Sequence, residues 1–120
     1  MLTRPIPSTG EAIPVIGLGT WRAFDVRTDE TTRRLREVVK LLLDAGGQLI
    51  GSSPMYGRAE AVTGDLLAER AARPRAFLAT KVWTTGRERG IEQMRGSAQL
   101  LRTETIDLMQ IHNLVDWLFN

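Results

Sequence analysis

The sequence predicts an α/β fold, in which parallel (βα) repeats form half of a TIM-type (β/α)8 barrel behind an N-terminal β-hairpin. Three strand-then-helix units of similar size follow one another along the chain, which favours parallel strands joined by right-handed crossovers. Polar residues follow the ends of the strand segments, where sheets of this kind collect their chemistry. A whole barrel takes roughly 200 residues or more, and the chain has 120. We therefore expect one domain, residues 1–120, that holds about four βα units without the last helix.

The first elements are a hairpin and a long helix. A turn cluster at residues 7–11 divides the segment 2–16 into two short apolar stretches, as in a hairpin. Thr28 can cap a helix over residues 30–45, because its hydroxyl can accept a hydrogen bond from a free N–H of the first turn. Gly46 ends that helix, since glycine adopts the left-handed closing conformation without strain. The helix is expected to have one apolar face, which consists of Leu35, Val38, Val39, Leu42 and Leu43.

The later elements repeat the strand–helix order. Pro74 stops the second helix, because proline lacks the N–H that a continuing helix needs. The last strand is predicted to be buried and to end in His112 and Asn113. The expected strands cover residues 15–21, 48–52, 76–83 and 106–113, and the two later helices cover residues 60–71 and 88–101.

Composition and charge exclude several classes of protein. With no cysteine the chain has no disulfide and no thiolate site, and one histidine without clustered carboxylates predicts no metal site. Arginines are interspersed with acidic residues, for a net charge of +2, which indicates solvated helix faces instead of a nucleic-acid-binding stripe. No apolar run approaches the ~20 residues of a membrane span, and the start lacks the apolar stretch of a secretory signal. We therefore expect a cytoplasmic protein that binds neither nucleic acid nor membrane.

Four segments carry a family resemblance. They are residues 17–21 (GLGTW), 52–60 (SSPMYGRAE), 79–82 (ATKV) and 107–113 (DLMQIHN). In order and spacing they closely resemble the aldo-keto reductases, which are NADPH-dependent enzymes built on a (β/α)8 barrel. The predicted hairpin resembles the one that closes the bottom of the barrel in that family. One such motif would be weak, whereas four in register are specific.

The resemblance implies most of a catalytic tetrad of aspartate, tyrosine, lysine and histidine. Tyr56 would donate a proton to the substrate's carbonyl oxygen, Lys81 would lower the pKa of that tyrosine, and His112 would orient the substrate. A phenol with a pKa near ~10 loses its proton more easily beside a cation. The aspartate position, five residues before the tyrosine, is Gly51.

The loss of the aspartate affects Lys81 first. A buried ammonium without a counter-ion has a lowered pKa, and Tyr56 would then become less acidic. In an open half-barrel Lys81 could instead extend to solvent. Tyr56 could also be a packing residue at the start of its helix.

The resemblance leaves only remnants of a cofactor site. Thr20, Trp21 and Asn113 match parts of the family's nicotinamide and substrate surfaces, although Trp21, Trp83 and Trp117 are expected mainly to pack or to line a pocket. The family's phosphate-binding elements belong to the second half of the barrel. The segment 17–21 lacks the spacing of a glycine-rich dinucleotide loop. We therefore expect no cofactor to bind tightly, although NADPH serves the full-length family.

These observations predict a truncated fragment without NADPH-dependent carbonyl reductase activity. Because its sheet would have two unpaired edges, we expect self-association into a homodimer. Residues 118–120, which lose the family resemblance, suggest together with Gly51 an engineered or accidentally altered chain. Two alternatives stay open. Lys81, with Tyr56 and His112, could act on a small carbonyl compound as an amine nucleophile or base, or the chain could be a non-catalytic assembly or binding module.

Overall fold

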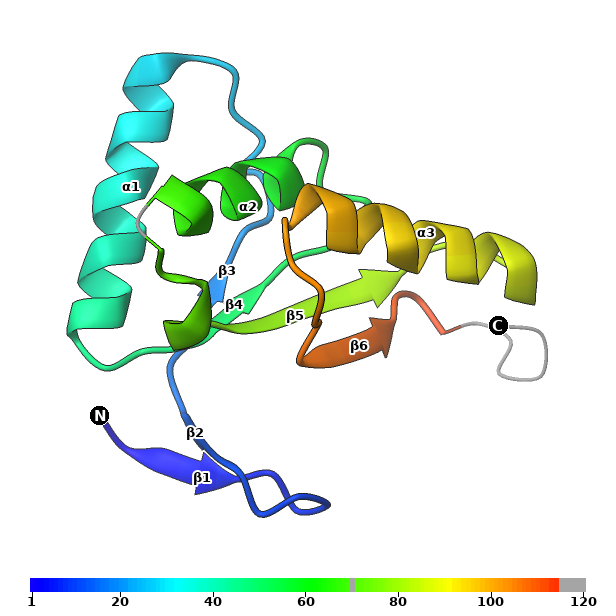
Figure 1. Ribbon diagram of the computed structural model, residues 1–120, viewed down its shortest axis with the longest axis horizontal. Helices are drawn as coiled ribbons and strands as arrows, with labels where there is room; N and C mark the ends of the chain where they lie inside the picture. The colour runs from blue at the N-terminus through cyan, green and yellow to red at the C-terminus, as the bar shows by residue number, and fades with distance from the viewer. Residues whose placement is uncertain (70, 115–120) are drawn as a thin grey trace.

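The structure is a computed structural model that describes residues 1–69 and 71–114. Within these residues a four-stranded sheet has α1, α2 and α3 on one side, and a separate two-stranded hairpin lies below it (Figure 1). The sheet order is β3-β4-β5-β6, and each neighbouring pair is parallel. The strands are β1 (Thr3–Pro5), β2 (Ala12–Pro14), β3 (Leu18–Gly19), β4 (Leu49–Gly51), β5 (Phe77–Val82) and β6 (Leu108–Ile111). The helices are α1 (Asp29–Asp44), α2 (Ala59–Glu69) and α3 (Arg87–Leu100), with a 3-10 turn at Arg73–Arg75.

The predicted α/β class with parallel strands is confirmed. The hairpin lies where the turn cluster indicated, since β1 and β2 pair antiparallel around a turn that contains Gly10 at φ +73°. The strand expected at residues 15–21 is shorter than expected, because only Leu18 and Gly19 form the ladder with β4. The Trp117 side chain and the segment 118–120, about which expectations were stated, lie outside the described residues.

Helix α1 begins and ends at the expected signals. The Thr28 hydroxyl accepts a hydrogen bond from the Thr31 N–H at 3.3 Å, and Gly46 follows the helix at φ +83°. Of the apolar face, Leu35, Val39 and Leu43 are buried, whereas Val38 is 40% exposed. The three buried residues are spaced four apart and form one stripe along the helix. A helix that packs against the protein on one side buries such a stripe and leaves the neighbouring residues partly exposed.

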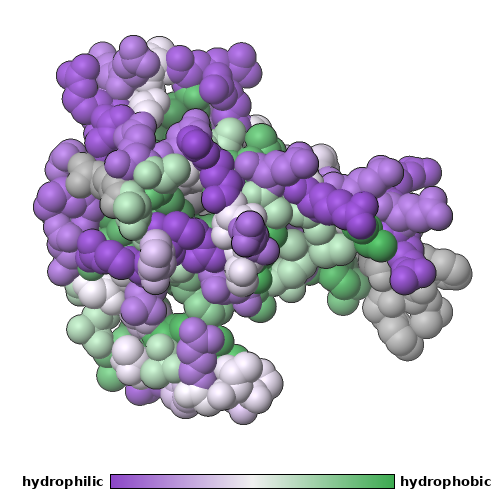
Figure 2. All heavy atoms as spheres, in the orientation of Figure 1, coloured by the Kyte–Doolittle hydropathy of each residue, from purple (hydrophilic) through white to green (hydrophobic). Residues whose placement is uncertain are grey.

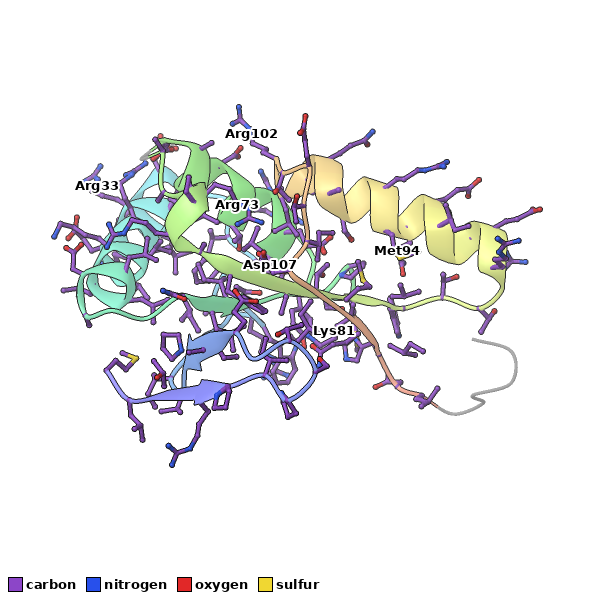
Figure 3. All side chains as sticks on the ribbon, turned by 60° about the horizontal axis from the view of Figure 1, so that its bottom comes forward. Arg33, Arg73, Lys81, Met94, Arg102 and Asp107 are labelled. Carbon is purple, nitrogen blue, oxygen red and sulfur yellow. The ribbon has the colours of Figure 1, made fainter. Side chains whose placement is uncertain are left out.

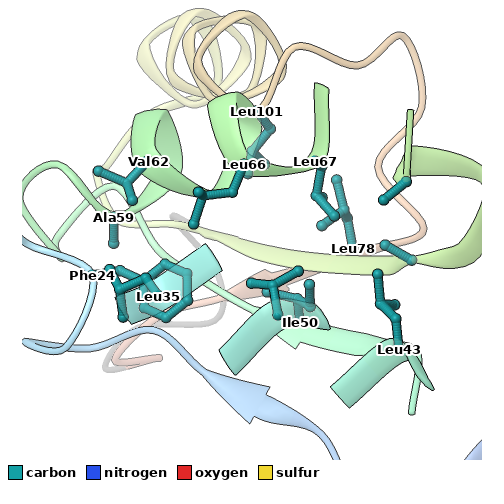
Figure 4. Packing of buried hydrophobic residues seen from close by; sticks show 13 residues of the cluster. Phe24, Leu35, Leu43, Ile50, Ala59, Val62, Leu66, Leu67, Leu78 and Leu101 are labelled. Atoms are coloured by element: carbon teal, nitrogen blue, oxygen red, sulfur yellow. The ribbon is translucent and has the colours of Figure 1, made fainter. Parts of the chain in front are cut away.

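The core lies between the sheet and helices α1 and α2 (Figure 4). The fully buried side chains include Ile50 of β4, Leu78 of β5 and Leu66 of α2. Helix α2 approaches the end of α3 closely at Gly64, where an added Cβ would lie 2.2 Å from the Leu100 carbonyl oxygen. Only glycine permits this approach, and it brings α2 and α3 together over the sheet.

The edge strand β6 was predicted to be buried, and that prediction is wrong. Leu108 is 43% exposed and Ile111 is 48% exposed. The strand has a neighbour on one side only, since it pairs with β5 and ends the sheet order. Figure 2 shows hydrophobic residues below α3, over the sheet, while the helices carry mainly hydrophilic ones. The described strands thus leave apolar surface uncovered at this edge.

One arginine ties β6 to the rest of the sheet. The Arg73 guanidinium donates hydrogen bonds to the Thr103 hydroxyl (2.9 Å), to the carbonyl oxygens of Ala76 (2.7 Å) and Thr105 (2.6 Å), and to the Asp107 carboxylate (3.0 Å). Asp107 also accepts a hydrogen bond from the Leu78 N–H at 2.7 Å, and Figure 3 shows the two charged side chains side by side. The sequence suggested a solvated arginine here, whereas the structure makes Arg73 the anchor of the last strand.

No described helix is long and apolar enough to cross a membrane. The described residues contain no group of three or more histidine and carboxylate side chains placed to hold a metal ion.

Candidate active site

The ends of β3, β4, β5 and β6 meet at one rim of the sheet. Backbone hydrogen bonds continue past the strands there: the Thr20 N–H donates to the Gly51 carbonyl (3.0 Å), the Ser52 N–H to the Ala79 carbonyl (2.8 Å), and the His112 N–H to the Val82 carbonyl (2.9 Å). Parallel strands place the residues that follow them at a common edge. Residues that are far apart in the sequence therefore become neighbours.

Lys81 turns toward the neighbouring strand end. Its Nζ donates a hydrogen bond to the Ser52 carbonyl oxygen at 2.7 Å and lies 5.3 Å from the centroid of the Tyr56 ring. The residue is half-buried, and this hydrogen bond directs its ammonium group toward the end of β4. Burial lowers the pKa of the Lys81 ammonium, and the negative charge of Glu60 opposes part of that shift.

Tyr56 and His112 meet edge to face. Their ring centroids are 5.7 Å apart, with an angle of 87° between the ring planes. The His112 ring is held through Nδ1, which lies 2.9 Å from the Ser53 hydroxyl. That hydroxyl oxygen also accepts a hydrogen bond from the Met55 N–H at 3.2 Å. Ser53 can donate its own proton to Nδ1, which leaves the proton of a neutral imidazole on Nε2.

Tyr56 packs at the start of its helix and also lies at the rim. It is partly buried against the hydrophobic core, and its ring also contacts the two polar side chains of the rim, Lys81 and His112. The structure therefore brings the three predicted site residues together from α2's leading turn, β5 and the end of β6.

Gly51 lies in open space on this rim. A Cβ built there would have a single neighbour within 4 Å, the Leu18 carbonyl oxygen at 4.0 Å. An aspartate side chain fits at this position without moving the backbone. Gly51 pairs with Ala79, two residues before Lys81 on the adjacent strand. A carboxylate at position 51 would therefore face Lys81, since residues two apart on a strand share a face.

Glu60 is a titratable residue to which the sequence analysis assigned no role. Its carboxylate, on α2, is 1% exposed; it accepts a hydrogen bond from the Thr80 hydroxyl at 2.6 Å and another from the Ser97 hydroxyl at 3.1 Å. Burial raises the pKa of Glu60, while both hydroxyls and the Lys81 charge oppose the shift. The sequence does show a glutamate four residues after the tyrosine, in the first turn of an apolar helix. Its role could not be predicted, because the groups that contact it come from other elements.

The three residues predicted as remnants of a cofactor site differ in burial and in contacts. Thr20 is fully buried, and its hydroxyl donates toward the Gly51 carbonyl (3.1 Å) and the Ser52 hydroxyl (2.9 Å), so it supports the rim from inside. Trp21 is 57% exposed and is stacked by the Arg22 guanidinium at 4.4 Å. Asn113 is exposed in a left-handed conformation, at φ +56°. Thr20 is thus held inside the rim, whereas Trp21 and Asn113 are exposed.

The fold and the rim together define a parallel (βα) half-barrel with tyrosine, lysine and histidine at the carboxyl ends of its strands. Residues 15–118 match the family model "Aldo/keto reductase family". The chain belongs to that family.

Individual relatives agree with this assignment. Aldo-keto reductase YhdN of Bacillus subtilis is 34% identical over 89% of this chain, which spans 36% of that relative. A solved structure from Pseudomonas aeruginosa, described as an aldo-keto reductase, superposes with a TM-score of 0.84 at 29% identity over 98% of this chain and 48% of its own. An aldo/keto reductase from Klebsiella pneumoniae, in complex with NADP and acetate, gives a TM-score of 0.75 at 27% identity over 86% and 36% of the two chains. The chain thus spans a third to a half of the length of these relatives.

Proposed function

We propose that this rim is the proton-donating part of an aldo-keto reductase carbonyl site. Tyr56 would protonate the carbonyl oxygen, Lys81 would ease release of that proton, and His112 would orient the substrate. What supports the proposal is the placement of the Tyr56 ring 5.3 Å from the Lys81 Nζ and 5.7 Å from the His112 ring. The substrate class is a small carbonyl compound. The cofactor of a full-length protein of this kind would be NADPH, as the NADP complex of the Klebsiella relative suggests.

The 120-residue chain by itself is proposed to lack NADPH-dependent turnover. Lys81 donates to a backbone carbonyl, and position 51 supplies no carboxylate to hold its charge. Loss of one positioned charged or hydrogen-bonding group in an active site commonly costs about 3–4 kcal/mol of transition-state stabilisation. In addition, Thr20 is occupied by internal hydrogen bonds and is not free to hold a cofactor.

A steady-state assay with NADPH and an aromatic aldehyde tests the proposal. We expect no oxidation of NADPH above the rate of a Tyr56→Phe variant. Without bound NADPH there is no hydride transfer to the carbonyl carbon, so a proton from the tyrosine has no reaction to complete. Turnover at the rate of ordinary enzymes that disappears in Tyr56→Phe would overturn the proposal. Gly51→Asp is expected not to restore turnover, since it adds a counter-ion and no dinucleotide site.

We also propose that the chain self-associates as a dimer. Strands β3 and β6 are the two edges of the described sheet, and β6 exposes Leu108 and Ile111. Two four-stranded copies around a twofold axis would supply the strands of a closed eight-stranded barrel and pair every edge. Sedimentation equilibrium is expected to give twice the 13.4 kDa chain mass. A well-folded monomer at high micromolar concentration would refute dimerisation while leaving the carbonyl site untouched.

A further inference from the structure

Lys81 has a setting that the reductase chemistry does not need. Its Nζ has a hydrogen bond to the Ser52 carbonyl oxygen at 2.7 Å, and none of the ion pairs between described residues includes it. A carbonyl oxygen accepts a hydrogen bond from an amine as well as from an ammonium, whereas a carboxylate strongly favours the ammonium. The geometry therefore tolerates loss of the proton.

The space that a reacting carbonyl group needs lies beside this amine. Gly51 has open surroundings, with one atom within 4 Å of a Cβ built there, and it faces the same side of the sheet as Lys81 through its pairing with Ala79. The Tyr56 ring lies 5.3 Å from the Lys81 Nζ, and His112 contacts that ring. An amine, a phenol and an imidazole thus converge on an accessible rim position.

We propose that Lys81 is an amine nucleophile that forms an imine with small aldehydes and activated ketones entering beside Gly51. This activity is separate from NADPH-dependent reduction and needs no cofactor. Lys40, the only other lysine, lies on the surface of α1 with its Nζ 2.6 Å from the Asp44 carboxylate. It provides an internal reference for a surface lysine that is paired with a carboxylate.

The reaction balances without an oxidant or reductant. The Nζ lone pair of the neutral amine attacks the carbonyl carbon, a C–N bond forms, and the oxygen receives the π electrons and a proton from the Tyr56 phenol. The nitrogen then gives up a proton, which returns to the phenolate. In the second step the Tyr56 phenol donates its proton to the carbinolamine hydroxyl while the nitrogen lone pair forms the C=N bond, the C–O bond breaks and water leaves. The iminium that results returns its N–H proton to the phenolate. Amine and carbonyl compound become imine and water, and His112 supports the proton transfers.

The groups that face Lys81 set its pH dependence. Burial lowers the pKa of Lys81 below its ordinary value of 10.5, and Glu60 from α2 opposes that shift. Tyr56 faces Lys81 with its ring, and His112 comes from the end of β6 with its Nδ1 at the Ser53 hydroxyl. Each unit by which the pKa falls raises the fraction of neutral amine about tenfold at neutral pH.

Reductive trapping on the whole chain tests the proposal. The protein is incubated at neutral pH with a small aldehyde and borohydride, which reduces an imine to a stable amine, and the labelled positions are identified by peptide mapping. We expect Lys81 to be labelled about tenfold or more faster than Lys40, in line with a lowered pKa. The N-terminal amine of Met1 is scored separately, since it is a third primary amine that reacts with aldehydes in any chain.

A matched pair of variants separates charge from space. Gly51→Asp supplies a carboxylate facing Lys81 and is expected to slow labelling of Lys81 about tenfold, toward the rate of Lys40. Gly51→Asn fills the same space without charge, so the slowing it causes measures the loss of entry space alone and is expected to be smaller than the slowing caused by Gly51→Asp. Labelling of Lys81 no faster than that of Lys40 in the unmodified chain overturns the proposal, and this measurement requires no variant to fold. Equal slowing by both variants overturns the role assigned to charge.

Discussion

Arg73 anchors the strand that carries His112, and its removal provides a quantitative test of the fold. The Arg73→Met variant keeps a long unbranched side chain and removes the guanidinium. Four hydrogen bonds are lost, to the Thr103 hydroxyl, to the carbonyls of Ala76 and Thr105, and to the Asp107 carboxylate. The ion pair is only about one-quarter exposed, at 25% and 26% for its two side chains, so solvent compensates for its loss incompletely.

The expected cost follows from these contacts. A hydrogen bond contributes about 0.5–1.5 kcal/mol to stability and somewhat more when a charged group takes part. Part of each lost bond is replaced by water at this partly exposed site. We therefore expect Arg73→Met to lower the free energy of unfolding by about 2–3 kcal/mol. Arg75→Met is the control, because Arg75 is 54% exposed and has one distant contact, to Asp44 at 3.4 Å, which predicts a loss within about 0.5 kcal/mol.

Urea unfolding followed by tryptophan fluorescence at one protein concentration measures both variants. The midpoint is expected to fall by about 1–2 M urea for Arg73→Met and to stay nearly constant for the control. Hydrogen exchange is expected to accelerate first in β6, because Asp107 also holds the Leu78 N–H and thereby the β5–β6 register. Equal midpoints for the two variants, or uniform acceleration of exchange, would refute the role of Arg73 as an anchor.

Three further results are expected. Burial raises the pKa of Glu60 above 4.5, so the folded state binds this proton more tightly than the unfolded chain does. The free energy of unfolding of the natural chain, relative to that of Glu60→Gln, should therefore decline as pH rises from 4.5 through the raised pKa. A pH-independent difference in urea titrations would contradict this. Gly64→Ala should lower the free energy of unfolding by about 1–3 kcal/mol, since its Cβ would meet a backbone carbonyl at 2.2 Å. Gly96→Ala, with open space around it, should raise the free energy of unfolding by about 0.5–1 kcal/mol. Thermal melts that give the same sign for both variants would refute the packing argument. Leu66→Ala should cost about 2–5 kcal/mol by calorimetry because Leu66 is 1% exposed, and Leu41→Ala, at 64% exposed, should differ little from the natural chain.

Much of the fold could be predicted from local signals. The caps at Thr28 and Gly46, the stop at Pro74 and the alternation of apolar and helical segments place α1, α2 and α3 within two residues of their observed ends. Such signals act through neighbouring residues in the chain, so they are legible without tertiary structure. The strand at residues 15–21 was overestimated, because a ladder exists only where the partner strand supplies hydrogen-bonding groups.

The candidate site was predictable in its members and not in its contacts. The motifs around Tyr56, Lys81 and His112 identify the residues, and the parallel strand order explains why they meet. The missing aspartate at Gly51 was also visible in the sequence. The hydrogen-bond acceptor that Lys81 uses instead, the Ser52 carbonyl, was not, since any backbone carbonyl at the rim could have taken that place.

The sequence by itself determined the class of this protein, the order of its elements and the three side chains of the candidate site. Tertiary structure alone decided which polar groups are partners. Arg73 reads as one more surface arginine until the segments that lead into β5 and β6 surround it with four acceptors, and Glu60 reads as a helix-surface acid until Thr80 and Ser97 enclose it. Local patterns follow from chain geometry, whereas the burial and pKa of a side chain depend on atoms supplied by distant elements, which come together only when the sheet and helices pack.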